Sequence, residues 1–167
     1  MHADASGKYS VELYSDCQRA VMFTHDNSHM RWGAPIKTTA PAAEGLHALV
    51  QEIDDPAGLC IGKIHCDGGA EFKGTFQEFC VSLGITIETN APYIPEENVI
   101  AERGFGTITG TTRRLLLGAP HLPDGLWAEA FRAAIYMNRT PTEGLDGTSP
   151  LEVWEGQPLG SMQHIHE

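Results

Sequence analysis

Short segments of strand-like composition alternate in this chain with longer segments of helical periodicity, and this alternation constrains the fold more than any other feature of the sequence. Strand-like composition is found in 9–15, 20–23, 60–65 and 85–89. Apolar residues at helical spacing are found in 41–53, 75–83, 99–117 and 124–138. This order predicts a chain of the α/β class, with helices covering a central sheet.

Local residue types indicate where several of these segments begin and end. The polar residues 16–19 predict a tight turn, and the segment 24–40 reads as a loop. Thr75 is expected to cap the helix that follows it, with Glu78 as its capping-box partner. The helix over 99–117 is marginal by propensity, because each of its internal glycines costs up to about 1 kcal/mol.

The composition excludes several classes of protein. With 167 residues the chain is the size of one domain, and no apolar run reaches the roughly 18 to 20 residues that a membrane-spanning helix needs. The first residues lack the cationic start and apolar core of a secretory signal peptide, so we expect an intracellular protein. The four cysteines have no spacing suited to a zinc site. Taken alone, a net charge of −11 argues against a nucleic-acid-binding surface.

Two acidic residues occupy positions where a carboxylate could bind a metal ion. Asp67 ends an apolar strand and precedes two glycines, where a carboxylate is partly desolvated yet free to reach a cation. A turn-forming aspartate is the alternative interpretation of this position. Glu102 lies at the start of the helix over 99–117, where the helix dipole alone would also favour a negative charge. Position therefore does not decide between a structural and a catalytic role.

Three blocks of sequence resemble successive motifs of one known family. They are HCDGGAEF at 65–72, TNAPYIPEENVIAER at 89–103, and LPDGLWAEAFRAAIYMNRTPTEGLDGTSPLEVWEG at 122–156. The family is the integrase catalytic core of copia-type LTR retrotransposons, within the retroviral integrase superfamily. The resemblance runs from His2 to the C-terminus and implies an RNase H-like fold, with a central mixed five-stranded sheet flanked by helices.

The resemblance also implies which residues are catalytic. Asp67 and Glu102 match the second and third acids of the family, and the 34 residues between them are within one of the spacing usual in integrases. Asp4 matches the first acid, on the first strand, although Asp16 competes for that role. Together Asp4, Asp67 and Glu102 would bind two Mg²⁺ or Mn²⁺ ions, since carboxylate oxygens are the ligands that these hard cations prefer.

The implied reaction is DNA integration, in which a polynucleotidyl transferase trims the ends of retroelement DNA and joins them to target DNA. Further candidates for contact with nucleic acid are Tyr93, Asn98, Arg103, Arg113 and Arg114. Family members generally act in the nucleus as homo-oligomers on DNA, and no membrane partner is expected.

The sequence departs from the family directly after Arg103. Gly104, Phe105 and Gly106 stand where the family generally has Lys, Asn and Arg, so two cations expected on a DNA-facing turn are missing. Residues 1–156 are expected to form the core, with a truncated first strand, and 157–167 a C-terminal extension. Two alternatives stay open: a decayed or repurposed domain that only binds, and an RNase H-type nuclease.

Overall fold

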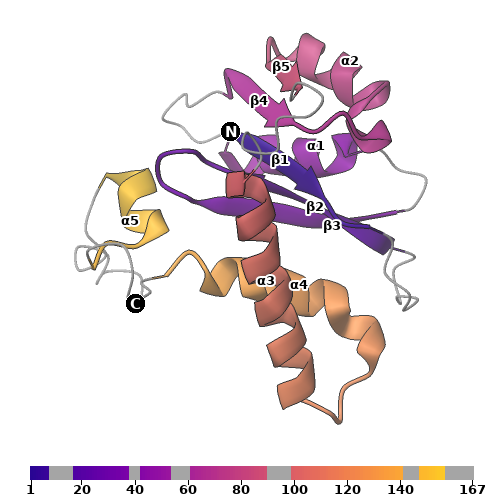
Figure 1. The fold of residues 1–167 in the computed structure, drawn as a ribbon, viewed down its shortest axis with the longest axis vertical. Helices are drawn as coiled ribbons and strands as arrows, with labels where there is room; N and C mark the ends of the chain where they lie inside the picture. The colour runs from indigo at the N-terminus through magenta and orange to yellow at the C-terminus, as the bar shows by residue number, and fades with distance from the viewer. Residues whose placement is uncertain (8–16, 38–41, 54–60, 90–98, 141–146, 157–167) are drawn as a thin grey trace.

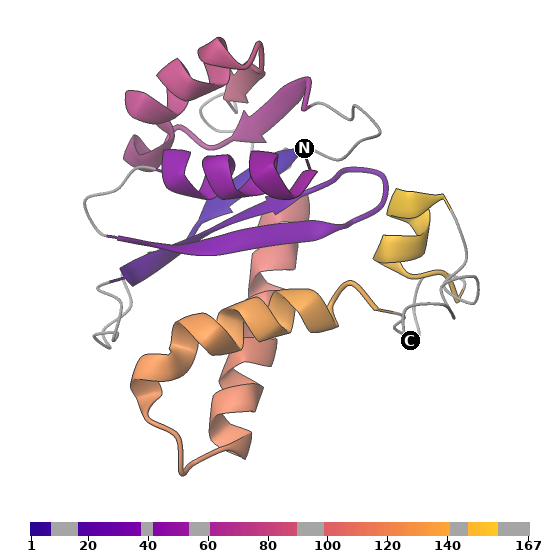
Figure 2. The same ribbon diagram turned by 180° about the vertical axis from the view of Figure 1, so that it is seen from behind.

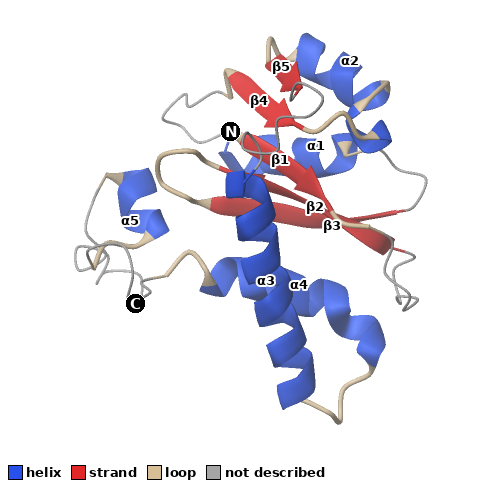
Figure 3. Cartoon of the chain, in the orientation of Figure 1, coloured by secondary structure: helices blue, strands red, loops and turns tan. Residues whose placement is uncertain are grey.

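A computed structural model describes residues 1–7, 17–37, 42–53, 61–89, 99–140 and 147–156. The strands are β1 (His2–Ala5), β2 (Cys17–Thr24), β3 (Arg31–Lys37), β4 (Lys63–Cys66) and β5 (Thr86–Thr89). They form one five-stranded sheet in the order β3-β2-β1-β4-β5 (Figure 3). The pairs β1–β2 and β2–β3 are antiparallel, whereas β1–β4 and β4–β5 are parallel. The mixed sheet that the family resemblance implied is therefore confirmed.

Helices cover both faces of the sheet, as Figures 1 and 2 show from opposite sides. The helices are α1 (Ala43–Ile53), α2 (Thr75–Ser82), α3 (Val99–Gly118), α4 (Trp127–Met137) and α5 (Pro150–Glu155), with short 3-10 turns at Ala70–Phe72 and Asp124–Leu126. Helices α1 and α2 lie on one face, and α3 and α4 cross each other on the opposite face. No helix within these described ranges is long and apolar enough to cross a membrane.

Strand β2 supplies side chains to both layers of the core because alternate residues of a strand point to opposite faces. Val21 and Phe23 pack with the apolar residues of α1 and α2, whereas Ala20 and Met22 pack with those of α3 and α4. The second layer also contains Phe131, as predicted from its helical spacing with Trp127 and Ile135. The sheet is thus enclosed on both sides.

The prediction of a loop over 24–40 is wrong, because β3 occupies Arg31–Lys37 within that segment. Its pattern is hidden by Gly33 and Pro35. A Cβ at Gly33 would lie 2.7 Å from Ile135 Cδ1 and 2.9 Å from the Val21 carbonyl oxygen, so α4 and β2 leave no room for a side chain. Pro35 is tolerated because β3 is an edge strand, where a missing N–H donor need not break the sheet.

Two predicted boundaries are also wrong. The polar residues 17–19 begin β2 instead of forming a turn, with a register irregularity between Cys17 and Arg19. Thr75 is the first residue of α2, and its N-cap is Gly74, whose positive φ of 59° suits glycine. The strand predicted over 9–15 lies outside the described residues.

Candidate active site

Asp4 lies at the centre of the sheet, on β1, which is flanked by an antiparallel and a parallel neighbour. Its side chain is half-buried, and its Oδ1 accepts a hydrogen bond from the Ala5 N–H at 2.8 Å. A carboxylate in this setting cannot be fully hydrated, so its charge is sensitive to its neighbours. The structure therefore places Asp4 on the first strand, as the resemblance implied, while Asp16 lies outside the described residues.

Asp67 follows the last residue of β4, the strand parallel to β1. Ala3 is paired with Cys66, so the next residue of each strand, Asp4 and Asp67, comes at the same edge of the sheet. Asp67 is exposed, and its Oδ1 accepts a hydrogen bond from the Gly69 N–H at 3.0 Å. This bond fixes the carboxylate over the turn that leads into the 3-10 helix.

Glu102 lies in the first turn of α3, and its side chain is exposed. Helix α3 contacts both β1 and β2, and its first turns lie beside the sheet in Figure 1. The helix thus brings Glu102 toward β1 from the far end of the sequence. The predicted position of Glu102 at a helix start is confirmed.

Asp4 is within electrostatic range of the other two candidate acids. Burial, together with the negative charges of Asp67, Glu102 and Glu71, raises the pKa of Asp4 to about 6, despite the opposing hydrogen bond from Ala5. Carboxylates far apart would not perturb one another in this way. The side chains that the sequence selected separately therefore share one electrostatic environment.

Glu71 is a fourth acid at this site, and the sequence analysis did not select it. It belongs to the 3-10 helix after Asp67, and its carboxyl group lies beside Gly69: a Cβ built on that glycine would be 2.9 Å from Glu71 Oε2 and 2.8 Å from Asp67 Oδ1. Gly69 thus lets the two acids approach the same backbone segment. The only signal in the sequence was the position of Glu71 in the motif that contains Asp67.

The chemistry of this cluster fits a divalent cation. Its donors are carboxylate oxygens, which Mg²⁺ and Mn²⁺ prefer, and their mutual repulsion is what a bound cation would offset. Among the described residues, no group of three acidic, histidine or cysteine side chains is already arranged to hold a metal ion. Side-chain rotation would be needed to complete coordination, which the two exposed acids, Asp67 and Glu102, permit.

The candidate DNA-contacting residues are distributed over the whole length of α3. Arg103 is exposed next to Glu102, while Arg113 and Arg114 are exposed near the other end of the helix. Arg103 and Arg114 lie about three turns, or roughly 16 Å, apart and close to the same face. Arg103 is therefore separated along α3 from Arg113 and Arg114. Tyr93 and Asn98 lie outside the described residues.

The structure shows where the three residues that differ from the family after Arg103 lie. Gly104 and Phe105 are buried, and the Phe105 ring packs at 6.0 Å from that of Phe131. Only Gly106 is exposed. The inference that two cations are missing from a DNA-facing turn is therefore wrong for one of its two positions, since 104 faces the sheet and only 106 is at the surface.

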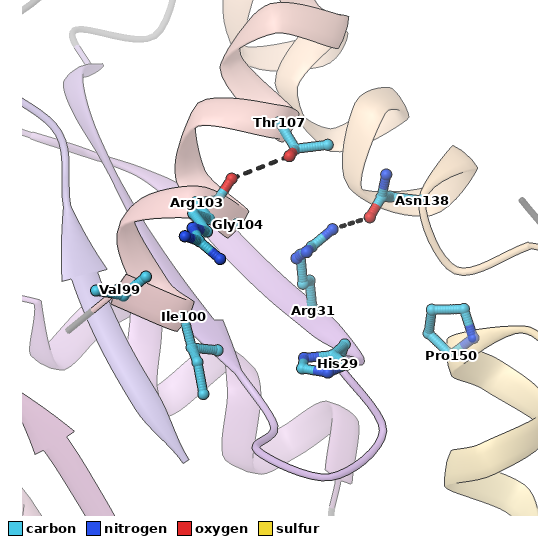
Figure 4. Close-up of a pocket in the computed structure, with 9 residues that line it drawn as sticks. All are labelled: His29, Arg31, Val99, Ile100, Arg103, Gly104, Thr107, Asn138 and Pro150. Carbon is cyan, nitrogen blue, oxygen red and sulfur yellow. Dashed lines mark hydrogen bonds between the residues drawn. The ribbon is translucent and has the colours of Figure 1, made fainter. Parts of the chain in front are cut away.

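A cavity of about 370 Å³ lies on the other flank of the same helix turns (Figure 4). Its polar walls come from Arg31 at the start of β3, Arg103 and Thr107 of α3, and Asn138 after α4. In Figure 4 the Arg31 side chain extends between α3 and α4 toward Asn138, whose Oδ1 accepts a hydrogen bond from Arg31 Nη1. No residue of this cavity other than Arg103 was a candidate from the sequence.

Curated proteins similar to this chain are polyproteins of plant transposons. The retrovirus-related Pol polyprotein from transposon TNT 1-94 of Nicotiana tabacum is 31% identical over 170 residues, covering 99% of this chain and 12% of that protein. The corresponding polyprotein from transposon RE1 of Arabidopsis thaliana is 29% identical over 152 residues, covering 84% and 10%. The chain thus spans about a tenth of these relatives. No profile of a known protein family matches it.

Solved structures with this fold are catalytic cores of retroviral integrases. The HTLV-2 integrase core in complex with magnesium, in its trimeric form, has a TM-score of 0.66 and 22% identity, over 91% of this chain and 93% of that one. The BIV integrase core has a TM-score of 0.68 and 18% identity, over 97% of both chains. A chain of the simian T-cell lymphotropic virus intasome with PP2A regulatory subunit B56 gamma has a TM-score of 0.73 and 21% identity, over 91% and 52%. These likenesses confirm the RNase H-like fold.

Proposed function

We propose that this chain, a homologue of one segment of the Pol polyproteins of copia-type transposons with the fold of an integrase catalytic core, is a metal-dependent polynucleotidyl transferase acting on DNA. Its reaction would be the trimming of retroelement DNA ends and their joining to target DNA. The proposal covers residues 1–156 as the core, with 157–167 belonging to a following segment. Action in the nucleus and assembly into homo-oligomers are parts of the same proposal.

The observation that carries this proposal is the convergence of Asp4, Asp67 and Glu102. They come from β1, from the end of β4 and from the first turn of α3. Burial raises the pKa of Asp4, and the charges of Asp67 and Glu102 add to the rise. Ionising Asp4 in this setting costs stability, because burial and the neighbouring negative charges both disfavour its charged form. A purely structural role does not explain why the fold concentrates like charges at one edge of its sheet.

Asp4, Asp67 and Glu102 are the residues that would hold the metal, and we propose two ions. Bound divalent cations would offset the charge of the attacked phosphodiester and lower the pKa of the attacking water or hydroxyl. The chain itself would supply one carboxylate on β1, a second directly after β4, and a third on α3. Half-burial of Asp4 strengthens its attraction for a cation by lowering the local dielectric constant.

Glu71 would act as a positioning residue for this site. Its carboxyl group and that of Asp67 flank Gly69, and its negative charge adds to the rise in the pKa of Asp4 while no cation is bound. We propose Asp4, and not Asp16, as the first acid, because the negative charges of Asp67 and Glu102 contribute to the raised pKa of Asp4.

The experiment is a strand-cleavage and joining assay with labelled LTR-end DNA and Mn²⁺ or Mg²⁺. The rate should fall by at least about 100-fold in each of the variants Asp4→Asn, Asp67→Asn and Glu102→Gln. The control Glu78→Gln, which removes an equivalent charge at an exposed position of α2, should not reduce the rate in this way. Retained activity in the Asp67 and Glu102 variants would refute the metal assignment. DNA binding by the wild-type chain without any cleavage would instead support the repurposed domain.

A further inference from the structure

Arg31 carries a positive charge into the body of the protein. Its side chain is half-buried, and burial lowers the pKa of its guanidinium from the usual value. The group donates one hydrogen bond, from Nη1 to Asn138 Oδ1, and its buried Nε has no hydrogen-bond partner. Within the described residues it forms no ion pair. Burying an unpaired cation is costly, so this arrangement calls for an anionic partner.

The position of Arg31 is held by contacts from α3 and from the residues that follow α4. Arg139 Nε donates a hydrogen bond to the Arg31 carbonyl oxygen at 3.2 Å, and the adjacent Asn138 binds the side chain. Gly104 lets α3 approach closely, since a Cβ there would be 3.0 Å from Arg31 Nε. The guanidinium is therefore pre-positioned at the cavity wall. Such pre-positioning lowers the entropy lost when a ligand binds.

The cavity beside Arg31 is positive although the protein is acidic. Its described walls contain two arginines, Arg31 and Arg103, together with His29 and Thr107, and they contain no aspartate or glutamate. The whole chain has 22 acidic and 11 basic residues. A cavity with two arginines and no acid in its described walls is therefore suited to an anion, for which guanidinium groups are effective donors.

We propose that this cavity binds a phosphate group of the DNA backbone, held by Arg31 and Arg103. The choice of DNA as the source of the phosphate rests on the proposed function. Arg103 directly follows Glu102, so about 100° of helix rotation separates the candidate metal-binding acid from the cavity wall. A DNA strand that crosses the first turns of α3 would present one phosphate to the acids and another to the arginines. The cavity would then set the register of the strand.

Two variants test the role of the cavity without removing Arg31, whose loss could unfold the protein. Asn138→Asp keeps the shape of the side chain and gives Arg31 an internal carboxylate partner, so the fold should persist while the site for an external anion is lost. Arg103→Gln removes the exposed arginine of the pair. Arg132→Gln is the matched control, because it removes an exposed arginine from α4 outside the cavity.

The measurement is fluorescence anisotropy with a short labelled duplex in EDTA over a series of salt concentrations. We expect Asn138→Asp and Arg103→Gln each to weaken binding roughly three- to tenfold and to make the log–log salt slope shallower by about 1, as for the loss of one phosphate contact. Arg132→Gln should change affinity less than about twofold. Thermal unfolding verifies that Asn138→Asp is folded.

Wild-type affinity and salt slope in a folded Asn138→Asp variant would overturn the proposal, as would the absence of wild-type binding at low salt. Inorganic phosphate provides a second arm. If it raises the Tm of the wild type and not of Asn138→Asp, while DNA affinity is equal in both, the cavity takes a free anion and the DNA assignment is wrong. Because EDTA removes divalent ions, loss of binding in the cavity variants is separable from loss of chemistry in Asp67→Asn.

Discussion

Gly104 of α3 lies directly against Arg31 of β3, with only 3.0 Å between Arg31 Nε and the place that a Cβ on Gly104 would occupy. The same hypothetical atom would be 3.2 Å from Met22 Cε. Gly106, two residues along the helix, has no atom within 4 Å of its hypothetical Cβ. A side chain at position 104 would therefore collide with its neighbours, whereas a side chain at position 106 would have free space around it.

Alanine substitutions should separate these constraints. Gly106→Ala is expected to raise the free energy of unfolding by roughly 0.5–1 kcal/mol, because alanine is the better helix former and nothing obstructs its methyl group. Gly104→Ala should raise the free energy of unfolding little or lower it, because Arg31 and Met22 must shift to make room for the methyl group. Urea denaturation of both variants measures the difference. Equal stabilisation of the two would show that α3 does not pack as closely on β3 as described.

Gly106→Arg should strengthen DNA binding. Position 106 is exposed on the turn of α3 that follows Glu102, and the integrase family generally has a cation there. One added phosphate contact should tighten binding at low salt roughly threefold and steepen the salt slope by about 1. Gly118→Arg, at the far end of α3, is the control for added charge. An equal gain in the control would mean that net charge, not position, determines affinity.

Phe105 is a core residue, so restoring the family's asparagine there should destabilise the protein. Phe105 packs with Phe131 and is only 9% exposed, and its replacement by a shorter polar side chain leaves a cavity and buries an amide. Phe105→Asn should cost about 3 kcal/mol or more in unfolding free energy, and Phe105→Leu much less. Chemical denaturation at neutral pH measures both. A cost below about 1 kcal/mol for asparagine would place residue 105 at the surface.

The sequence predicted the fold where its local patterns agree with the tertiary packing. The helices α1 and α4 have regular apolar spacing, and both were predicted within a few residues. Strand β3 was missed because Gly33 is required by contacts with Val21 and Ile135, which are distant in sequence and invisible to a local pattern. Helix α3 was judged marginal, yet it is the longest helix described, because packing against the sheet outweighs its glycines.

The candidate site shows the same division between local and tertiary information. Asp67 and Glu102 lie in motifs, so the sequence could select them. Glu71 lies in the same motif as Asp67 but was not selected, because its influence on Asp4 arises only when β1 and β4 pair side by side. The cavity with Arg31 and Asn138 likewise joins residues more than 100 positions apart. Such juxtapositions follow from topology and not from spacing.

The raised pKa of Asp4 predicts a specific dependence of stability on pH. Its pKa is about 6 in the folded protein, above the ordinary aspartate value of 3.8. Below the ordinary value the carboxyl is protonated in both states. As the pH rises from about 4 to above 6, the unfolded chain ionises first, so the folded state loses stability through this window. The contribution of Asp4 should therefore make the metal-free protein less stable at pH 7.5 than at pH 4.

Asp4→Asn removes this penalty. The variant is therefore expected to gain unfolding free energy, whereas replacing a buried polar group ordinarily lowers it. In EDTA the variant should be more stable than wild type by about 1 kcal/mol at pH 7.5, after allowance for solvent screening, and equal to it near pH 4. Added Mg²⁺ should stabilise the wild type and reverse the order, because only the wild type retains all three acids. Thermal unfolding at the two pH values, with and without Mg²⁺, measures this. If Mg²⁺ stabilised the variant as much as the wild type, Asp4 would not be a ligand.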